Sequence, residues 1–111
     1  LKTTQPMILT TTATIEGRPV QDYLGVINAQ SIIGANMFKD IFASLRDLVG
    51  GRSKTYERVI EQAKEDAMRE LTQKAQALGA NAVVGIDLDF ETVGASGSML
   101  MVIATGTAVR I

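Results

Sequence analysis

The segment 98–110 is apolar on both of its faces, and no other feature of this sequence constrains the fold as strongly. Side chains that alternate along a β-strand point to opposite faces of the sheet. Both alternating sets are apolar here: Met99, Met101, Ile103 and Val109 on one side, and Leu100, Val102, Ala104 and Ala108 on the other. A strand with this pattern is covered on both sides. We therefore expect a layer of protein against each face of the sheet.

The remaining segments predict the element order β-β-α-α-β-β. Segments 8–15 and 20–27 suit two strands joined by a turn at 16–19. Segment 82–93 predicts a third strand, which forms a hairpin with 98–110 through the turn 94–97. The expected fold class is α+β, with a small, mostly antiparallel sheet packed by a long helix. In the second strand we expect two faces, one with Val20, Leu24 and Val26 and the other with Tyr23 and Ile27.

Two helices are predicted between the second and third strands. Helix 36–49 repeats apolar residues at intervals of three and four and ends at Gly50 and Gly51. The longer helix, 54–78, is closed by Gly79 and has small residues that allow close packing on a sheet. Its expected buried stripe is Tyr56, Ile60, Ala63, Ala67, Leu71, Ala75 and Leu78. Two i, i+4 ion pairs are expected on its other side: Glu65 with Arg69, and Glu70 with Lys74.

The chain has 111 residues, which suits a single domain. We place this domain at 7–111, with Met7 as the natural start and 1–6 as an extension. A domain of this size buries only about two-thirds of its unfolded surface. The long helix can cover one sheet face, and helix 36–49 or a second subunit can cover the other. We favour a homo-oligomer that uses edge strands or a sheet face as its interface.

Composition and charge exclude several classes of protein. Hydrophobic residues make up 46% of the chain and charged residues 21%, a balance typical of an ordered globular domain. The net charge of −1 provides no attraction for a phosphate backbone or an anionic membrane, so we expect no nucleic-acid or membrane partner. No segment is long and apolar enough to span a membrane, and 1–6 lacks the apolar core of an export signal. With the lack of Cys, these features favour a cytoplasmic protein.

The chain contains no His, no Cys and no Trp. The side chains that usually bind soft metals, act as nucleophiles or transfer protons near neutral pH are therefore missing or unsupported. We predict no catalytic residue, no enzyme activity, no cofactor and no tight soft-metal site. Methionine thioethers can hold Cu(I), but the five in this chain are dispersed and fit core packing better: Met7, Met37, Met68, Met99 and Met101.

Three carboxylates alternate with apolar residues on the third predicted strand, and we call Asp87, Asp89 and Glu91 the acidic row. Their alternation places them on one sheet face, where they could bind a hard cation or line a charged pore in a ring. Residues two apart on a strand lie about 7 Å apart, which is too far for easy chelation of one ion. The alternative is a solvated face, or ion pairs with Arg110, Arg46 or Arg52.

The connection between the two predicted helices is Gly50-Gly51-Arg52-Ser53. A helix N-terminus with free backbone N–H groups and a guanidinium suits a phosphate or carboxylate ligand. The segment lacks the Walker spacing, and no predicted strand leads into it. The alternative is a plain helix connection, in which the glycines end one helix and Ser53 caps the next.

Several motifs resemble the YbjQ-like family of bacterial proteins: Gly34-Ala35-Asn36-Met37-Phe38-Lys39-Asp40, Arg46-Asp47-Leu48-Val49-Gly50-Gly51-Arg52-Ser53, Gly79-Ala80-Asn81-Ala82-Val83-Val84-Gly85-Ile86-Asp87 and Gly97-Ser98-Met99-Leu100-Met101. The resemblance runs from about Met7 to Ile111. It implies a dodecin-like subunit assembled as a ring, described for such proteins as a pentamer. The family is functionally uncharacterised and carries a heavy-metal-binding label. This chain lacks the Cys and His for that metal, and the Trp on which a flavin would stack, so neither ligand is carried over.

The favoured interpretation is a homo-oligomeric, non-catalytic protein of unknown biochemical role. Two alternatives belong to the binding-module class. One is a ring that binds a small anionic molecule at Gly50, Gly51, Arg52 and Ser53. The other is a carboxylate-lined cation site at the acidic row.

Overall fold

The computed structural model describes residues 6–34, 54–94 and 99–111. The described elements are β1 (Ile8–Leu9), β2 (Asp22–Ile33), α2 (Lys54–Ala77), β3 (Ala82–Val93) and β4 (Met99–Arg110). The strands form one mixed sheet in the order β1-β3-β4-β2. Only the β1–β3 pair is parallel, so the predicted α+β fold with a mostly antiparallel sheet is confirmed. The predicted helix 36–49 lies outside the described residues.

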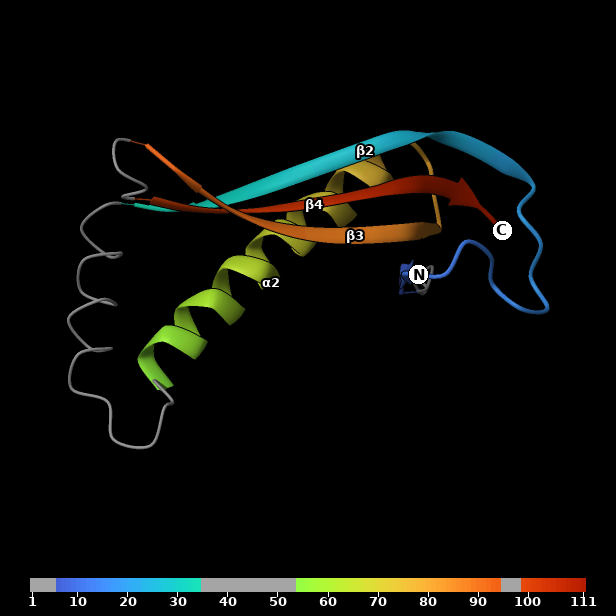
Figure 1. Cartoon of the computed structure of the whole chain (residues 1–111). Helices are drawn as coiled ribbons and strands as arrows, with labels where there is room; N and C mark the ends of the chain where they lie inside the picture. The colour runs from blue at the N-terminus through green and yellow to red at the C-terminus, as the bar shows by residue number, and fades with distance from the viewer. Residues whose placement is uncertain (1–5, 35–53, 95–98) are drawn as a thin grey trace, which may run out of the picture.

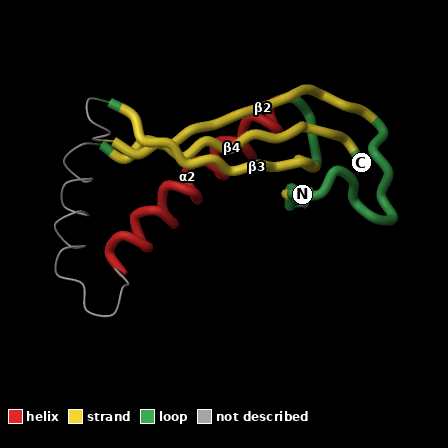
Figure 2. Tube along the Cα trace, in the orientation of Figure 1, coloured by secondary structure: helices red, strands yellow, loops and turns green. Residues whose placement is uncertain are grey.

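Helix α2 covers one face of the sheet and crosses it at an angle, with its first turns standing clear of the strands (Figures 1 and 2). The helix contributes a narrow stripe of buried residues: Ala63, Ala67, Leu71 and Ala75. These residues pack against the sheet side chains that face the helix, among them Ile27, Val83, Val102 and Ala104. Alanines on this stripe bring the helix axis close to the strands, as the sequence predicts.

Strand β4 lies in the middle of the sheet and separates two environments. Leu100, Val102, Ala104 and Ala108 face α2 and belong to the main core. Their neighbours along the strand point to the opposite face, which we call the open face. Near the end of β4, this opposite side is covered by the chain's own N-terminal segment, since Val109 packs with Ile15 and Val20. Toward the start of β4 the open face carries Met99, Met101 and Ile103, which are only half-buried.

The first strand is much shorter than predicted. β1 contains only Ile8 and Leu9, although strand 8–15 is expected from the β-branched composition. The threonines that follow bond to one another and to nearby backbone: Oγ1 of Thr10 lies 2.8 Å from Oγ1 of Thr12, and Oγ1 of Thr12 donates to the Thr14 carbonyl at 2.6 Å. Such local hydrogen bonds compete with a regular strand ladder. The backbones of Thr10 and Thr12 keep only irregular hydrogen bonds to β3, including the Gly85 N–H to the Thr12 carbonyl at 2.8 Å.

The second strand is longer than predicted, and its faces differ from the expected ones. It runs from Asp22 to Ile33, because pairing with β4 continues along the whole segment. A register shift between Tyr23 and Gly25 interrupts the alternation. Leu24 consequently packs with the core beside Ile27, while Val26 is 75% exposed. A β-bulge of this kind reverses which side chains reach the core beyond it.

Helix α2 ends one residue earlier than predicted and closes with a regular C-terminal motif. The N–H of Ala80 donates to the Ala75 carbonyl at 3.1 Å, and the N–H of Gly79 donates to the Gln76 carbonyl at 3.0 Å. Gly79 has φ +82°, which this Schellman arrangement requires and glycine adopts without strain. Leu78 therefore leaves the helix stripe and is 47% exposed, so its predicted burial is wrong.

The two ion pairs predicted on α2 are replaced by other contacts. Arg69 pairs with Asp66 rather than Glu65. Nζ of Lys74 donates to the backbone carbonyl of Asn28 at 2.7 Å. Tertiary contact thus overrides the i, i+4 spacing, because Lys74 reaches a strand that local sequence spacing does not describe.

Gly106 of β4 lies directly against core side chains of β3. It is buried, and a Cβ at this position would lie 2.6 Å from Cγ1 of Val83 and 3.2 Å from Cγ1 of Ile86. Val83 is fully buried and its β-branched side chain has few alternative rotamers. The absent side chain at Gly106 therefore makes room for the core side chains of β3.

Candidate functional site

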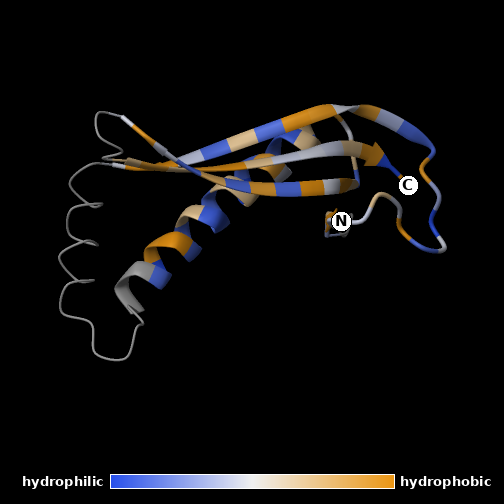
Figure 3. Ribbon diagram, in the orientation of Figure 1, coloured by the Kyte–Doolittle hydropathy of each residue, from blue (hydrophilic) through white to orange (hydrophobic). Residues whose placement is uncertain are grey.

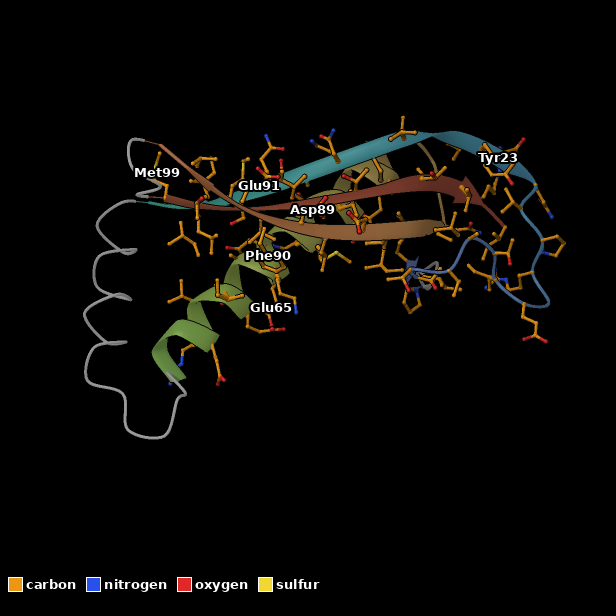
Figure 4. All side chains as sticks on the ribbon, viewed as in Figure 1. Tyr23, Glu65, Asp89, Phe90, Glu91 and Met99 are labelled. Atoms are coloured by element: carbon orange, nitrogen blue, oxygen red, sulfur yellow. The ribbon has the colours of Figure 1, made fainter. Side chains whose placement is uncertain are left out.

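The acidic row lies on the open face, on the side of β3 away from α2. Asp87, Asp89 and Glu91 stand opposite Thr105, Ile103 and Met101 of β4. All three acidic side chains are exposed, and Leu88 between them packs against the core on the helix side. Hydrophilic and hydrophobic residues alternate along β3 (Figure 3). Figure 4 shows Asp89 and Glu91 on one side of β3 and Phe90 on the side of α2.

The carboxyl groups of Asp87 and Asp89 interact directly. A hydrogen bond between these two side chains is the main cause that raises the pKa of Asp89. The negative charge of Asp87, desolvation and the negative charge of Glu91 raise the pKa of Asp89 further. A proton held on Asp89 relieves the repulsion within the row.

This raised pKa predicts a pH-dependent stability. Above the ordinary pKa of an aspartate, the folded chain retains more of the Asp89 proton than the unfolded chain, so the free energy of unfolding falls as the pH rises through this window. We expect Asp89→Asn to raise Tm at pH 7 and to change it less at pH 3, where the carboxyl is protonated in both states. Thermal melts at the two pH values measure this difference.

Glu70→Gln is the matched control, since it removes an exposed carboxylate from α2 on the other face of the sheet. It separates the local effect of Asp89 from the change in net charge. An Asp89→Asn variant with the same Tm gain at pH 3 and pH 7, or with none, contradicts the raised pKa of Asp89.

Arg110 does not pair with the acidic row. Its Nε and Nη2 atoms donate to Oδ2 of Asp22 at 3.0 and 2.7 Å, across the β2–β4 pair. The predicted alternative of an ion pair between the row and Arg110 is therefore wrong. Arg46 and Arg52 lie outside the described residues, as does the whole Gly50–Ser53 connection, so the anion-binding hypothesis stays a prediction.

A half-open cleft of about 410 Å³ lies where the chain after β1 leaves the edge of β3. Its walls are mostly apolar and come from three parts of the fold: Leu9, Thr10 and Thr11, then Met68 of α2, then Ile86, Asp87 and Leu88 of β3. Asp87 is its one charged lining residue. The cleft therefore marks the point at which β3 loses its neighbour on this side, beside the start of the acidic row.

The open face also exposes large apolar side chains on β2. Val26 is 75% exposed and Ile32 is 57% exposed. Ile32 stands opposite Met101 of β4, which in turn stands opposite Glu91 of β3. The start of β4 thus carries an apolar strip between the uncharged second half of β2 on one side and the acidic row on the other.

Metal ligands do not gather among the residues that the structure describes. No group of three or more His, Cys, Asp or Glu side chains in that part of the chain is arranged to hold a metal ion. Met7 and Met68 pack against the main core, as predicted, whereas Met99 and Met101 lie on the open face. No helix among the described residues is long and apolar enough to cross a membrane.

Comparison with known proteins gives consistent matches along the chain. A protein-family model described as "Putative heavy-metal-binding" matches residues 7–111. The "UPF0145 protein" of Caulobacter vibrioides, from either of two strains, is 58% identical over 103 residues and covers 93% of this chain and 98% of the relative. A crystal structure of a Pediococcus pentosaceus protein of unknown function, described as belonging to the DUF74 family, has a TM-score of 0.64 at 20% identity, with 95% and 97% coverage. This last similarity shows a common fold.

Proposed function

The chain belongs to the YbjQ-like family, and from this we propose that it acts as a non-catalytic homo-oligomer, a ring in which the open faces of the subunits turn toward one another. The observation that carries the proposal is the half-buried apolar strip of Met99, Met101 and Ile103 in the middle of the sheet. Contiguous apolar surface on a small domain is typical of an interface. The family resemblance supports a ring of five dodecin-like subunits.

The heavy metal in the family's description does not fit the donors of this chain. Soft metals select thiolate and imidazole ligands, and the sequence contains neither Cys nor His. Of the four described methionines, two are packed against the core and two lie on the open face. We therefore assign no heavy metal to this protein.

A second candidate function is hard-cation binding by the acidic row. The pKa of Asp89 is raised first by the side-chain hydrogen bond with Asp87 and then by the negative charge of Asp87. The repulsion between these charges favours this candidate, because a cation relieves it. Hard cations such as Ca²⁺ take about six to eight oxygen ligands, and carboxylates spaced about 7 Å apart along one strand do not all converge on one ion. The site would therefore need oxygen ligands from a second subunit, and it depends on the same assembly.

Met101→Asp tests the homo-oligomer. We expect the unmodified chain to sediment as several subunits at micromolar concentration, and the variant to sediment as a folded monomer. A charged side chain on the half-buried strip can reach water in the monomer, but it is costly to bury between subunits. Sedimentation velocity reports the mass, and far-UV circular dichroism reports the fold.

Gln73→Asp is the matched control, because it adds the same charge to an exposed position of α2. It should leave the mass unchanged. An unmodified chain that sediments as a monomer contradicts the proposal, and so does a Met101→Asp variant that keeps the full oligomer.

A further inference from the structure

We propose that neighbouring subunits join edge to edge. The outer edge of β2 in one copy would pair with β3 in the next copy, along the segment 87–93 that β1 does not cover. The inference rests on the homo-oligomer proposed above and names its interface. A second copy of this chain would pair with each of the two strand edges.

In the part of the chain that the structure describes, the second half of the outer edge of β2 lacks the usual protection of an exposed strand. β2 ends the strand order, so no described strand pairs with its outer side. Natural edges are protected by charged residues, proline, bulges or a covering element. Here the bulge near Gly25 and the Lys74 hydrogen bond to the Asn28 carbonyl protect only the first half. The segment 29–33 has no charged residue and no proline, and it includes the exposed Ile32.

The edge of β3 is free over a similar length. β1 pairs only with Ala82 and Val83, and the last backbone hydrogen bond from this side joins the Ile86 N–H to the Thr10 carbonyl at 3.1 Å. Beyond it, no described strand borders the segment 87–93 on this side. The cleft at Asp87 is the corner where such a strand would begin.

The charges select which edges meet. Two β3 edges placed together would bring two acidic rows side by side, which is unfavourable. β2 instead presents Asn28 and Gln30 on the open face, at the same level across β4 as Asp87 and Asp89. Side-chain amides donate hydrogen bonds to carboxylates. The row makes no ion pair with a described Lys or Arg, so an uncharged donor from the next copy would complement it.

The topology fixes the direction of the pairing. β2 and β3 are both antiparallel to β4, so they run the same way. Rotation about an axis that lies roughly along the strands keeps this direction, and β3 would therefore pair with the next β2 in parallel. The same contact repeated around the axis closes the sheet and removes both free edges.

Cysteine cross-linking tests this contact, because the natural chain has no Cys. Gln30→Cys is combined in turn with Asp87→Cys, Asp89→Cys or Glu91→Cys, which scans the register. Within one copy, β4 separates these positions by two strand spacings, about 9.5 Å. Cα atoms more than about 7 Å apart cannot form a disulfide, so any disulfide must join two copies.

We expect at least one double variant to form a ladder of covalent oligomers after mild oxidation, seen on non-reducing denaturing gels, while each single-Cys variant stays monomeric on the gel. Dimers of Gln30→Cys alone would show that two β2 edges meet, and would overturn the proposal. A chain that sediments as an oligomer but gives no double-variant ladder overturns this interface while leaving the homo-oligomer intact. A monomeric unmodified chain overturns both.

Discussion

Val102→Asp is expected to abolish folding. Val102 lies at the centre of β4, is fully buried, and faces α2 within the main core. A carboxylate in this position loses its hydration and gains no partner, which costs on the order of several kcal/mol. That is a large share of the roughly 5–15 kcal/mol that stabilises a typical domain. Far-UV circular dichroism and a thermal melt would show loss of the helix signal and of the cooperative transition.

The preceding residue provides the control. Met101 lies on the open face, so Met101→Asp should keep the cooperative melt of a folded chain. The sequence alone assigns both residues to apolar faces and does not separate these two outcomes. A Val102→Asp variant that melts cooperatively near the natural temperature would contradict the position of Val102 in the core.

Leu71→Ala is expected to lower the free energy of unfolding by about 2–5 kcal/mol. Leu71 is the largest fully buried side chain on α2, and its neighbours on the buried stripe are alanines. Those short side chains cannot move in to fill the space, so a cavity remains beneath the sheet. Urea unfolding measures the loss, at one fixed protein concentration because assembly contributes to the apparent stability.

Leu78→Ala makes the same chemical change at the end of the same helix. Leu78 is 47% exposed, so we expect a change of about 0.5 kcal/mol or less. If the two variants lost similar amounts of unfolding free energy, the buried stripe would have to continue beyond Ala75 to Leu78, contrary to the structure.

Regular periodicity made a large part of the fold predictable. The spacing of alanines predicts α2 to within one residue at its end, and the alternation of charged and apolar residues predicts Ala82–Val93 correctly. The short turn between the last two strands predicts their antiparallel pairing, which the register from Val93 and Met99 onward confirms. Each of these features is set by residues close together in the chain.

Features that depend on distant residues were not predictable. The bulge near Gly25 exists because β2 pairs with β4, and it decides that Leu24 rather than Val26 reaches the core. The regular strand β1 ends where threonines of high strand propensity bond to one another and make only irregular backbone hydrogen bonds to β3. The need for glycine at 106 arises from Val83, more than twenty residues away along the chain.

The candidate site was predictable in part. Alternation places Asp87, Asp89 and Glu91 on one face, and the register with β4 agrees. The effect of Asp87 on the pKa of Asp89 was not expected, because backbone positions two apart on a strand lie about 7 Å apart, whereas side-chain carboxyl groups can lean toward each other. The apolar strip beside the row follows from the pattern of β4, whereas the uncharged edge of β2 is recognised only once the strand order is known.

Native mass spectrometry of the untagged, unmodified chain, purified without added metal, tests the central claim most directly. It counts the subunits and retains a tightly bound ion or small molecule in one measurement. The homo-oligomer predicts one dominant species containing several copies of the 111-residue chain, with five as the number that the family resemblance implies. A spectrum dominated by the monomer at micromolar concentration would contradict the claim.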